Sequence, residues 1–178
     1  MTGSADKSAR SIGDAIRRAR AYLNRRPEKA RYTDAAAIAR LEEGLRCRVE
    51  GPGGAAVVTD MSTGVGGRGS APSPGWLLRA AHAACDVTLI AMRAADLGID
   101  LARLEVIVDS ESDDRGLLGM DDSVPAGPLR TRVRVAIAAP GVPESQVHSI
   151  VVWAHAHSPV DDALARSVPV VFEVTSDS

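Results

Sequence analysis

A chain of 178 residues with 45% hydrophobic and 25% charged residues is typical of a single globular domain. A domain of this size buries about 70% of its unfolded surface, so it needs neither disulfides nor a structural metal to fold. The net charge of −2 gives no basis for binding nucleic acid or an anionic membrane. We therefore expect no nucleic acid and no membrane among its partners.

The cysteine content and the N-terminal segment indicate a cellular compartment. Cys47 and Cys85 are too few for a disulfide-stabilised secreted domain. The N-terminal segment lacks the apolar run of a signal peptide, and no stretch approaches the roughly 18 apolar residues of a membrane span. We expect a reduced, cytoplasmic protein.

The N-terminal residues predict a polar tail followed by a short helix. Residues 1–10 look like a disordered start, and residues 11–25 carry apolar side chains at helical spacing. Pro27 is expected to end this amphipathic helix. We interpret the arginines on its other sides as a solvated face. The expected domain organisation is this tail and helix in residues 1–30 and one main domain in residues 31–178.

Three strands are predicted next, at residues 32–41, 44–50 and 55–59. The turn at residues 51–54, Gly-Pro-Gly-Gly, is a strong hairpin signal between the second and third strands. The glycine-rich stretch that follows lacks the GK[ST] sequence of a phosphate-binding loop. We interpret it as a flexible connection into the next helix.

The best-marked element is a helix that begins at Pro74 and ends before Gly98. Ser73 is a good N-cap, proline suits the first helical position, and glycine is the usual residue after a helix C-terminus. The helix is apolar nearly all round. This pattern predicts a buried central helix.

The second half of the chain alternates strands with one helix. Strands are predicted at residues 104–109 and 130–137, a helix at 144–157 that Pro159 ends, and a last strand at 168–174. In residues 130–137 the apolar side chains face one side and three arginines the other, which favours a solvated sheet face. The order of elements indicates an α+β fold with a largely antiparallel sheet.

Cys85, on the central helix, is the main candidate for chemistry. A buried cysteine is most often an inert small hydrophobe, whereas a reactive thiol needs a cationic neighbour and access to its substrate. His82 lies three residues earlier and either pairs with Cys85 to make a nucleophile or packs in a helix interface. Cys47, on a strand, is expected in the core.

The histidines near the C-terminus do not predict a metal site. His155 and His157 point to different faces of their helix, and His148 lies two turns from His155. We predict no metal and no other cofactor.

Three stretches resemble the osmotically inducible protein C / organic hydroperoxide resistance (OsmC/Ohr) family. GGRGSAPSPGWLLRAAHAAC resembles its central-helix motif, and GIDLARLEVIVDSESDDRG resembles the strand and charged loop that follow. AHAHSPVDDAL with VPVVFEV resembles the closing helix, Pro-Val turn and last strand. The resemblance covers about residues 40–175. It implies an OsmC-like α+β fold with largely antiparallel sheets around a buried central helix, in an intertwined homodimer with active sites at the interface.

The resemblance also implies a thiol-dependent peroxidase that reduces organic hydroperoxides through Cys85. In this family a second cysteine before the last Pro closes a disulfide with the first. Here Ser158 occupies that second position, so the chain is similar to the OsmC-like branch that lacks the second cysteine. The alignment predicts that Ser158 lies close to Cys85 in space.

Two further family positions differ in this chain. An arginine and a glutamate hold the thiolate in the family, but Gly75 and Trp76 replace the glutamate, and the first hairpin turn offers no arginine. Arg46 and Arg48 are the nearest candidates to substitute for that arginine.

Two functions remain open at this point. The first is a one-cysteine peroxidase, in which the sulfenic acid of Cys85 is reduced by an external thiol or by Cys47. The alternative is a non-catalytic homodimer that binds a small apolar ligand at the interface. In that reading Trp76 and the aliphatic helix would form the pocket.

Overall fold

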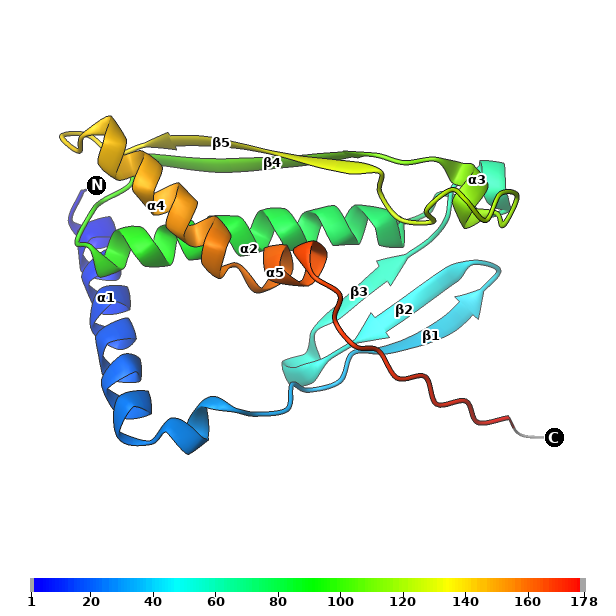
Figure 1. Ribbon diagram of the computed structural model, residues 1–178, viewed down its shortest axis with the longest axis horizontal. Helices are drawn as coiled ribbons and strands as arrows, with labels where there is room; N and C mark the ends of the chain where they lie inside the picture. The colour runs from blue at the N-terminus through cyan, green and yellow to red at the C-terminus, as the bar shows by residue number, and fades with distance from the viewer. Residues whose placement is uncertain (1, 177–178) are drawn as a thin grey trace.

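The computed structural model describes the backbone of residues 2–176 and the side chains of residues 10–176. Figure 1 shows a long central helix, α2 (Pro74–Asp96), with a two-stranded hairpin along one side and a separate three-stranded sheet drawn below it. All strand pairs are antiparallel, so the predicted α+β class with antiparallel sheets is confirmed. Within the described residues, no helix has the length and apolar character needed to cross a membrane.

The N-terminal helix is longer than the sequence indicates. Helix α1 (Thr2–Arg25) begins near the start of the chain, so the expected disorder of residues 2–10 is wrong, and Met1 lies outside the described residues. No proline interrupts this segment, and adding a residue to an existing helix is far easier than nucleating one. The helix ends before Pro27, as predicted, and a short 3₁₀ turn, η1 (Pro27–Ala30), follows.

Helix α1 crosses the C-terminal end of α2 at close range (Figure 1). Gly13 is buried there, and a Cβ atom at this position would lie 2.6 Å from the carbonyl oxygen of Ala95. The guanidinium of Arg20 donates two hydrogen bonds to Asp96, at 2.8 and 2.9 Å. The first helix is therefore fixed on the main body by a backbone approach that only glycine permits.

The three predicted N-terminal strands form one sheet, β1 (Ile38–Glu43), β2 (Arg46–Glu50) and β3 (Ala56–Thr59), in that order. The Gly-Pro-Gly-Gly turn joins β2 to β3 through a 3₁₀ turn, η2 (Pro52–Gly54), as expected. The first strand begins at Ile38 rather than at residue 32. Ile38 pairs with Glu50, the last residue of β2, so the residues before it have no partner strand.

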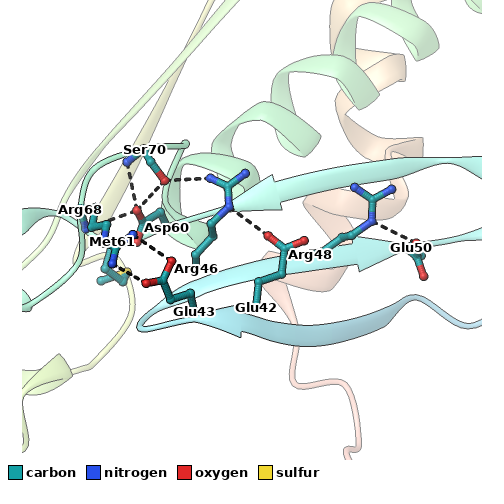
Figure 2. Close-up of polar contacts among 9 residues, drawn as sticks. All are labelled: Glu42, Glu43, Arg46, Arg48, Glu50, Asp60, Met61, Arg68 and Ser70. Atoms are coloured by element: carbon teal, nitrogen blue, oxygen red, sulfur yellow. Dashed lines mark hydrogen bonds and ion pairs between the residues drawn. The ribbon is translucent and has the colours of Figure 1, made fainter.

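The glycine-rich connection to α2 is held by one buried carboxylate and is more ordered than expected. Asp60 is 2% exposed and accepts hydrogen bonds from the backbone N–H groups of Met61, Arg68 and Ser70 and from the Ser70 hydroxyl (Figure 2). The bonds from the Ser70 backbone and hydroxyl lower the pKa of Asp60. A 3₁₀ turn, η3 (Thr63–Val65), lies inside the loop.

Helix α2 begins and ends where its sequence signals predict. The Ser73 hydroxyl accepts a bond from the Trp76 N–H at 3.2 Å, and Gly98 adopts the left-handed conformation at φ +69. One face of the helix is buried. On the other side, Leu78 and Met92 remain 38% and 37% exposed, so one copy of the chain does not cover the helix completely.

The long hairpin consists of β4 (Arg103–Glu111) and β5 (Arg130–Ala138), both slightly longer than predicted. The connection between them contains a short helix, α3 (Asp114–Leu117). Val135 and Ile137 lie against the core, as the alternation predicts. The arginines of β5 lie on the other face and form ion pairs with the acidic residues of β4, Asp109 and Glu111.

Helix α4 (Glu144–His157) matches its prediction, but a further helix, α5 (Pro159–Ala165), does not appear in the sequence interpretation. Pro159 ends α4 and also starts α5, because proline suits the first turn of a helix. The Ser158 hydroxyl accepts a bond from the Asp161 N–H at 3.3 Å and so caps α5.

The predicted last strand at residues 168–174 is wrong for the single chain. These residues are extended but form no strand, and Figure 1 shows them running away from the helices. Val171 and Phe172 are 84% and 87% exposed. A strand needs a neighbouring edge to hydrogen-bond, and in the described residues none of the sheet edges pairs with this segment.

The core lies where α2, α4 and the hairpin meet. Its buried members are Ile90, Ala94, Ile99, Ile150 and Ala154. The alanines let α4 approach α2 closely, and this approach positions the junction between α4 and α5 against the middle of α2.

Candidate functional site

Cys85 lies on α2 opposite the junction of α4 and α5. The Ser158 hydroxyl donates a hydrogen bond to the Cys85 sulfur at 3.2 Å, so the two residues that the resemblance brings together are in contact. Ser158 is fully buried, and Cys85 is half-buried. Cys85 is therefore shielded in part but not enclosed.

His82 is not the partner of Cys85. Its Nε2 atom lies 2.6 Å from Oδ1 of Asp161 and 3.6 Å from Oδ2 of Asp86. All three residues are buried, with 5%, 7% and 4% exposure for His82, Asp161 and Asp86. His82 and Asp86 are one turn apart on α2, and Asp161 comes from the first turn of α5. The packed-histidine interpretation is correct, but the histidine packs against two carboxylates.

The two carboxyl groups affect each other's protonation. Burial raises the pKa of Asp86 to about 6, helped by its hydrogen bond with Asp161 and by that residue's charge, while His82 and Ser158 act in the opposite direction. For Asp161, burial alone would raise the pKa. The hydrogen bond from Asp86 and the charges of His82 and His155 outweigh burial, so the net pKa of Asp161 is lowered. Asp86 is therefore the first of the two carboxyl groups to take up a proton as the pH falls.

A pocket of about 460 Å³ reaches this cluster from the N-terminal end of α2. His82 forms part of its wall, and the apolar side chains of Met61, Leu78, Leu117 and Leu164 line much of the rest. Arg79 also lines the pocket, where its guanidinium donates to the Ser110 hydroxyl at 3.2 Å. The pocket has the size and composition of a small-molecule site.

The two arginines predicted near Cys85 have other partners within one chain. Figure 2 shows Arg46 between Glu42 and Ser70: its Nε donates to the Glu42 carboxylate at 2.9 Å, and its Nη1 donates to the Ser70 hydroxyl at 2.8 Å. Arg48 binds Glu50 at 3.0 Å along its own strand. Both side chains are thus engaged on the small sheet.

The remaining predicted residues lie apart from this cluster. Trp76 is 48% exposed and does not line the pocket described above. Cys47 is half-buried on β2, paired with Leu41 and Thr59 on the neighbouring strands.

Sequence reasoning missed Asp86 and Asp161. One signal was available for the first of them: Asp86 is a charged residue within an otherwise apolar helix, one turn after His82, and such a residue rarely becomes buried without a partner. Asp161 had no comparable signal, because nothing local shows that its short helix folds onto α2.

Comparisons with known proteins agree with the fold. The family described as OsmC-like protein matches residues 67–173, more than half of the chain. An OsmC-like protein from Mycoplasma pneumoniae has a similar structure, with a TM-score of 0.64 and 14% identity, covering 76% of this chain and 89% of that one. No curated protein sequence matches.

Two further solved structures are similar in fold. One is described as an organic hydroperoxide resistance protein OsmC from Legionella pneumophila, with a TM-score of 0.53, 22% identity and coverage of 72% of this chain and 88% of that one. The other is an organic hydroperoxide resistance protein from Elizabethkingia anophelis, with a TM-score of 0.55, 18% identity and coverage of 75% and 89%. With the family match over the central helix, the hairpin and the closing helices, the chain belongs to the OsmC-like family.

Proposed function

We propose that this protein is a one-cysteine, thiol-dependent peroxidase that reduces small organic hydroperoxides through Cys85. The observation that carries the proposal is the contact of the Cys85 sulfur with Ser158, at the place where the family keeps its second cysteine. Cys85 is half-buried rather than enclosed, and partial access is what peroxide attack requires. Two structures of similar fold are described as organic hydroperoxide resistance proteins.

The proposed chemistry uses Cys85 as nucleophile. Its thiolate attacks one peroxide oxygen, the O–O bond breaks, the sulfur becomes a sulfenic acid, and the alcohol leaves after taking up a proton. Ser158 cannot form the disulfide that a second cysteine would form. An external thiol must therefore attack the sulfenic acid, release water, and be exchanged by a second thiol to restore Cys85. Such thiols are abundant in the cytoplasm, where we propose the protein works.

Among the described residues, the hydrogen-bond partner of Cys85 is Ser158 and not a basic side chain. Arg46 and Arg48 are bound to Glu42 and Glu50 on their own sheet, so neither serves the Cys85 of the same chain. We propose that the protein works as a homodimer in which a basic residue of the partner favours the thiolate. The exposed apolar residues of α2 and of the C-terminal segment support such an assembly.

Trapping the sulfenic acid tests the peroxidase. Cumene hydroperoxide is added to the Cys47→Ser protein in the presence of dimedone, and the adduct is located by mass spectrometry. We expect one adduct at Cys85 and none in the Cys47→Ser, Cys85→Ser double variant. Absence of the adduct in a folded protein whose Cys85 reacts with iodoacetamide would rule out the peroxidase.

If no dimedone adduct forms at Cys85, the alternative function is that of a non-catalytic protein that binds a small apolar ligand. The observation that favours it is the pocket of about 460 Å³, which is lined largely by apolar side chains and does not include Cys85. An environment-sensitive fluorescent fatty acid would bind the protein, and Leu78→Trp, which fills the pocket, would abolish binding, while Cys85→Ser would leave it unchanged.

A further inference from the structure

We propose that His82, Asp86 and Asp161 form a binding site for one divalent transition-metal ion. Each residue offers one ligand atom, and these three atoms lie within 4.8 Å of one another. Ligand atoms bonded to one tetrahedral zinc ion at about 2.1 Å lie about 3.4 Å apart, so small side-chain rotations would bring these atoms to that spacing. The site does not depend on Cys85 reacting with peroxide.

Unsatisfied buried oxygens are the observation that points to a ligand. Asp86 is 4% exposed, yet no N–H or hydroxyl group of the described residues donates to its Oδ1 atom, so only a proton shared with the neighbouring Asp161 carboxyl could satisfy it. Oδ2 of Asp161 is buried too and forms no hydrogen bond; its polar neighbour is Nδ1 of the exposed His155, in an ion-pair contact at 3.1 Å. Buried carboxylate oxygens nearly always find a partner, because an oxygen left without one has lost the hydrogen bonds that water gave it and gained nothing in return. A cation between the two side chains would satisfy both.

The charge balance favours a cation over a neutral ligand. Asp86 and Asp161 bring two acidic groups into a buried space whose buried imidazole is that of His82, while the exposed His155 approaches Asp161 from outside at 3.1 Å. Arg79, the basic residue of the adjoining pocket, is turned to Ser110 on β4 instead. An ion with two positive charges would neutralise the carboxylates and accept the imidazole nitrogen at the same time.

The ligand set selects the class of metal. Imidazole suits zinc, iron, cobalt and nickel, and two carboxylates are compatible with zinc and manganese. Magnesium prefers an all-oxygen octahedral shell and keeps most of its waters, so it fits poorly beside His82. The pocket of about 460 Å³ reaches His82, which provides an entry path and room for a water molecule as a fourth ligand.

The surroundings already orient two of the three ligands. The Ser158 hydroxyl accepts from the Asp161 backbone N–H at 3.3 Å, which fixes the first turn of α5. His82 and Asp86 are four residues apart on one helix, a spacing that places both side chains on the same face. Because Ser158 also contacts Cys85, a bound ion would lie close to the thiol.

The test uses tag-free, full-length protein stripped with EDTA and dialysed against Zn²⁺, with bound zinc measured by atomic emission. We expect one zinc per chain, and no comparable binding of Mg²⁺. Asp161→Asn should weaken zinc binding by at least about tenfold. The matched control is Asp162→Asn, which changes the exposed neighbouring carboxylate, bound to Arg166 at 2.6 Å, and should bind zinc like the wild type.

A second measurement separates a lost ligand from a lost fold. The Asp86→Asn variant should unfold at the same or a higher temperature than the wild type in EDTA, because a buried acidic group is removed, but zinc should no longer raise that temperature. Cys85→Ser should still bind zinc, which keeps this test independent of peroxidase activity. The proposal is overturned if folded wild-type protein binds no stoichiometric zinc, if Asp86→Asn and Asp161→Asn bind like the wild type, or if Cys85→Ser alone abolishes binding.

Discussion

Replacing Ser158 with cysteine should restore a disulfide with Cys85. The Ser158 oxygen and the Cys85 sulfur are already 3.2 Å apart, and a disulfide requires its sulfurs at about 2.05 Å. An approach of about 1 Å is therefore needed, which side-chain rotation can supply. Both residues lie on packed helical segments, so the geometry is preset by the fold.

The stabilisation follows from the length of the closed loop. The two positions are 73 residues apart, and restricting a loop of that length in the unfolded chain gives about 4 kcal/mol in the chain-entropy treatment. The substitution also weakens the cap that Ser158 provides to α5, at about 1 kcal/mol. We expect the oxidised variant to be about 3 kcal/mol more stable than the wild type. Its unfolding temperature should rise by about 10 °C for a protein of this size.

The assay compares thermal unfolding of the variant with and without dithiothreitol, in a Cys47→Ser background. Mass spectrometry of tryptic peptides would identify the bond. The matched control is Ser149→Cys, on the exposed side of α4, which should form no bond with Cys85.

If Ser158→Cys stays reduced under mild oxidation while the protein remains folded, the placement of the α4–α5 junction against α2 is wrong. If the bond forms but adds no stability, the loop-entropy reasoning fails instead.

Three other predictions concern the loop, the core and the assembly. Asp60→Asn should destabilise the protein at pH 7, because the fold lowers the pKa of Asp60 and so favours its ionised form. The difference in stability from the wild type should shrink as the pH falls below about 4, which chemical denaturation at several pH values would show. Ile150→Ala, at a fully buried position, should cost about 2–5 kcal/mol in denaturant unfolding, whereas Val152→Ala, 52% exposed on the same helix, should cost much less. Sedimentation should show a dimer that Phe172→Glu weakens and Glu173→Gln does not; a wild-type monomer at micromolar concentration with native circular dichroism would contradict the homodimer.

Much of the fold could be predicted because its signals are local. Ser73, Pro74 and Gly98 mark the ends of α2 by backbone requirements that hold in any context. The alternation in residues 130–137 and the Gly-Pro-Gly-Gly turn likewise define β5 and the β2–β3 hairpin without reference to distant residues. The resemblance to the family predicted that Ser158 lies beside Cys85, because the helices of that fold bring these two positions together.

Other features depended on contacts between distant parts of the chain. The segment at residues 168–174 has strand-forming residues, but a strand also needs an edge to pair with, and the described part of the chain places no sheet edge against it. Arg46 and Arg48 share the expected strand face, but the partners of such flexible side chains are decided by which carboxylates the fold brings within reach.

The cluster around His82 shows most clearly which features follow from the local sequence and which depend on tertiary packing. By itself the sequence determined that His82 and Asp86 share one face of a buried helix, since that follows from helical geometry alone. Only the tertiary structure decided that α5 folds back to place Asp161 2.6 Å from His82. The physical reason is that the position of α5 depends on how α4 packs on α2 through Ile150 and Ala154, and packing at that range sums many weak contacts that no local pattern records.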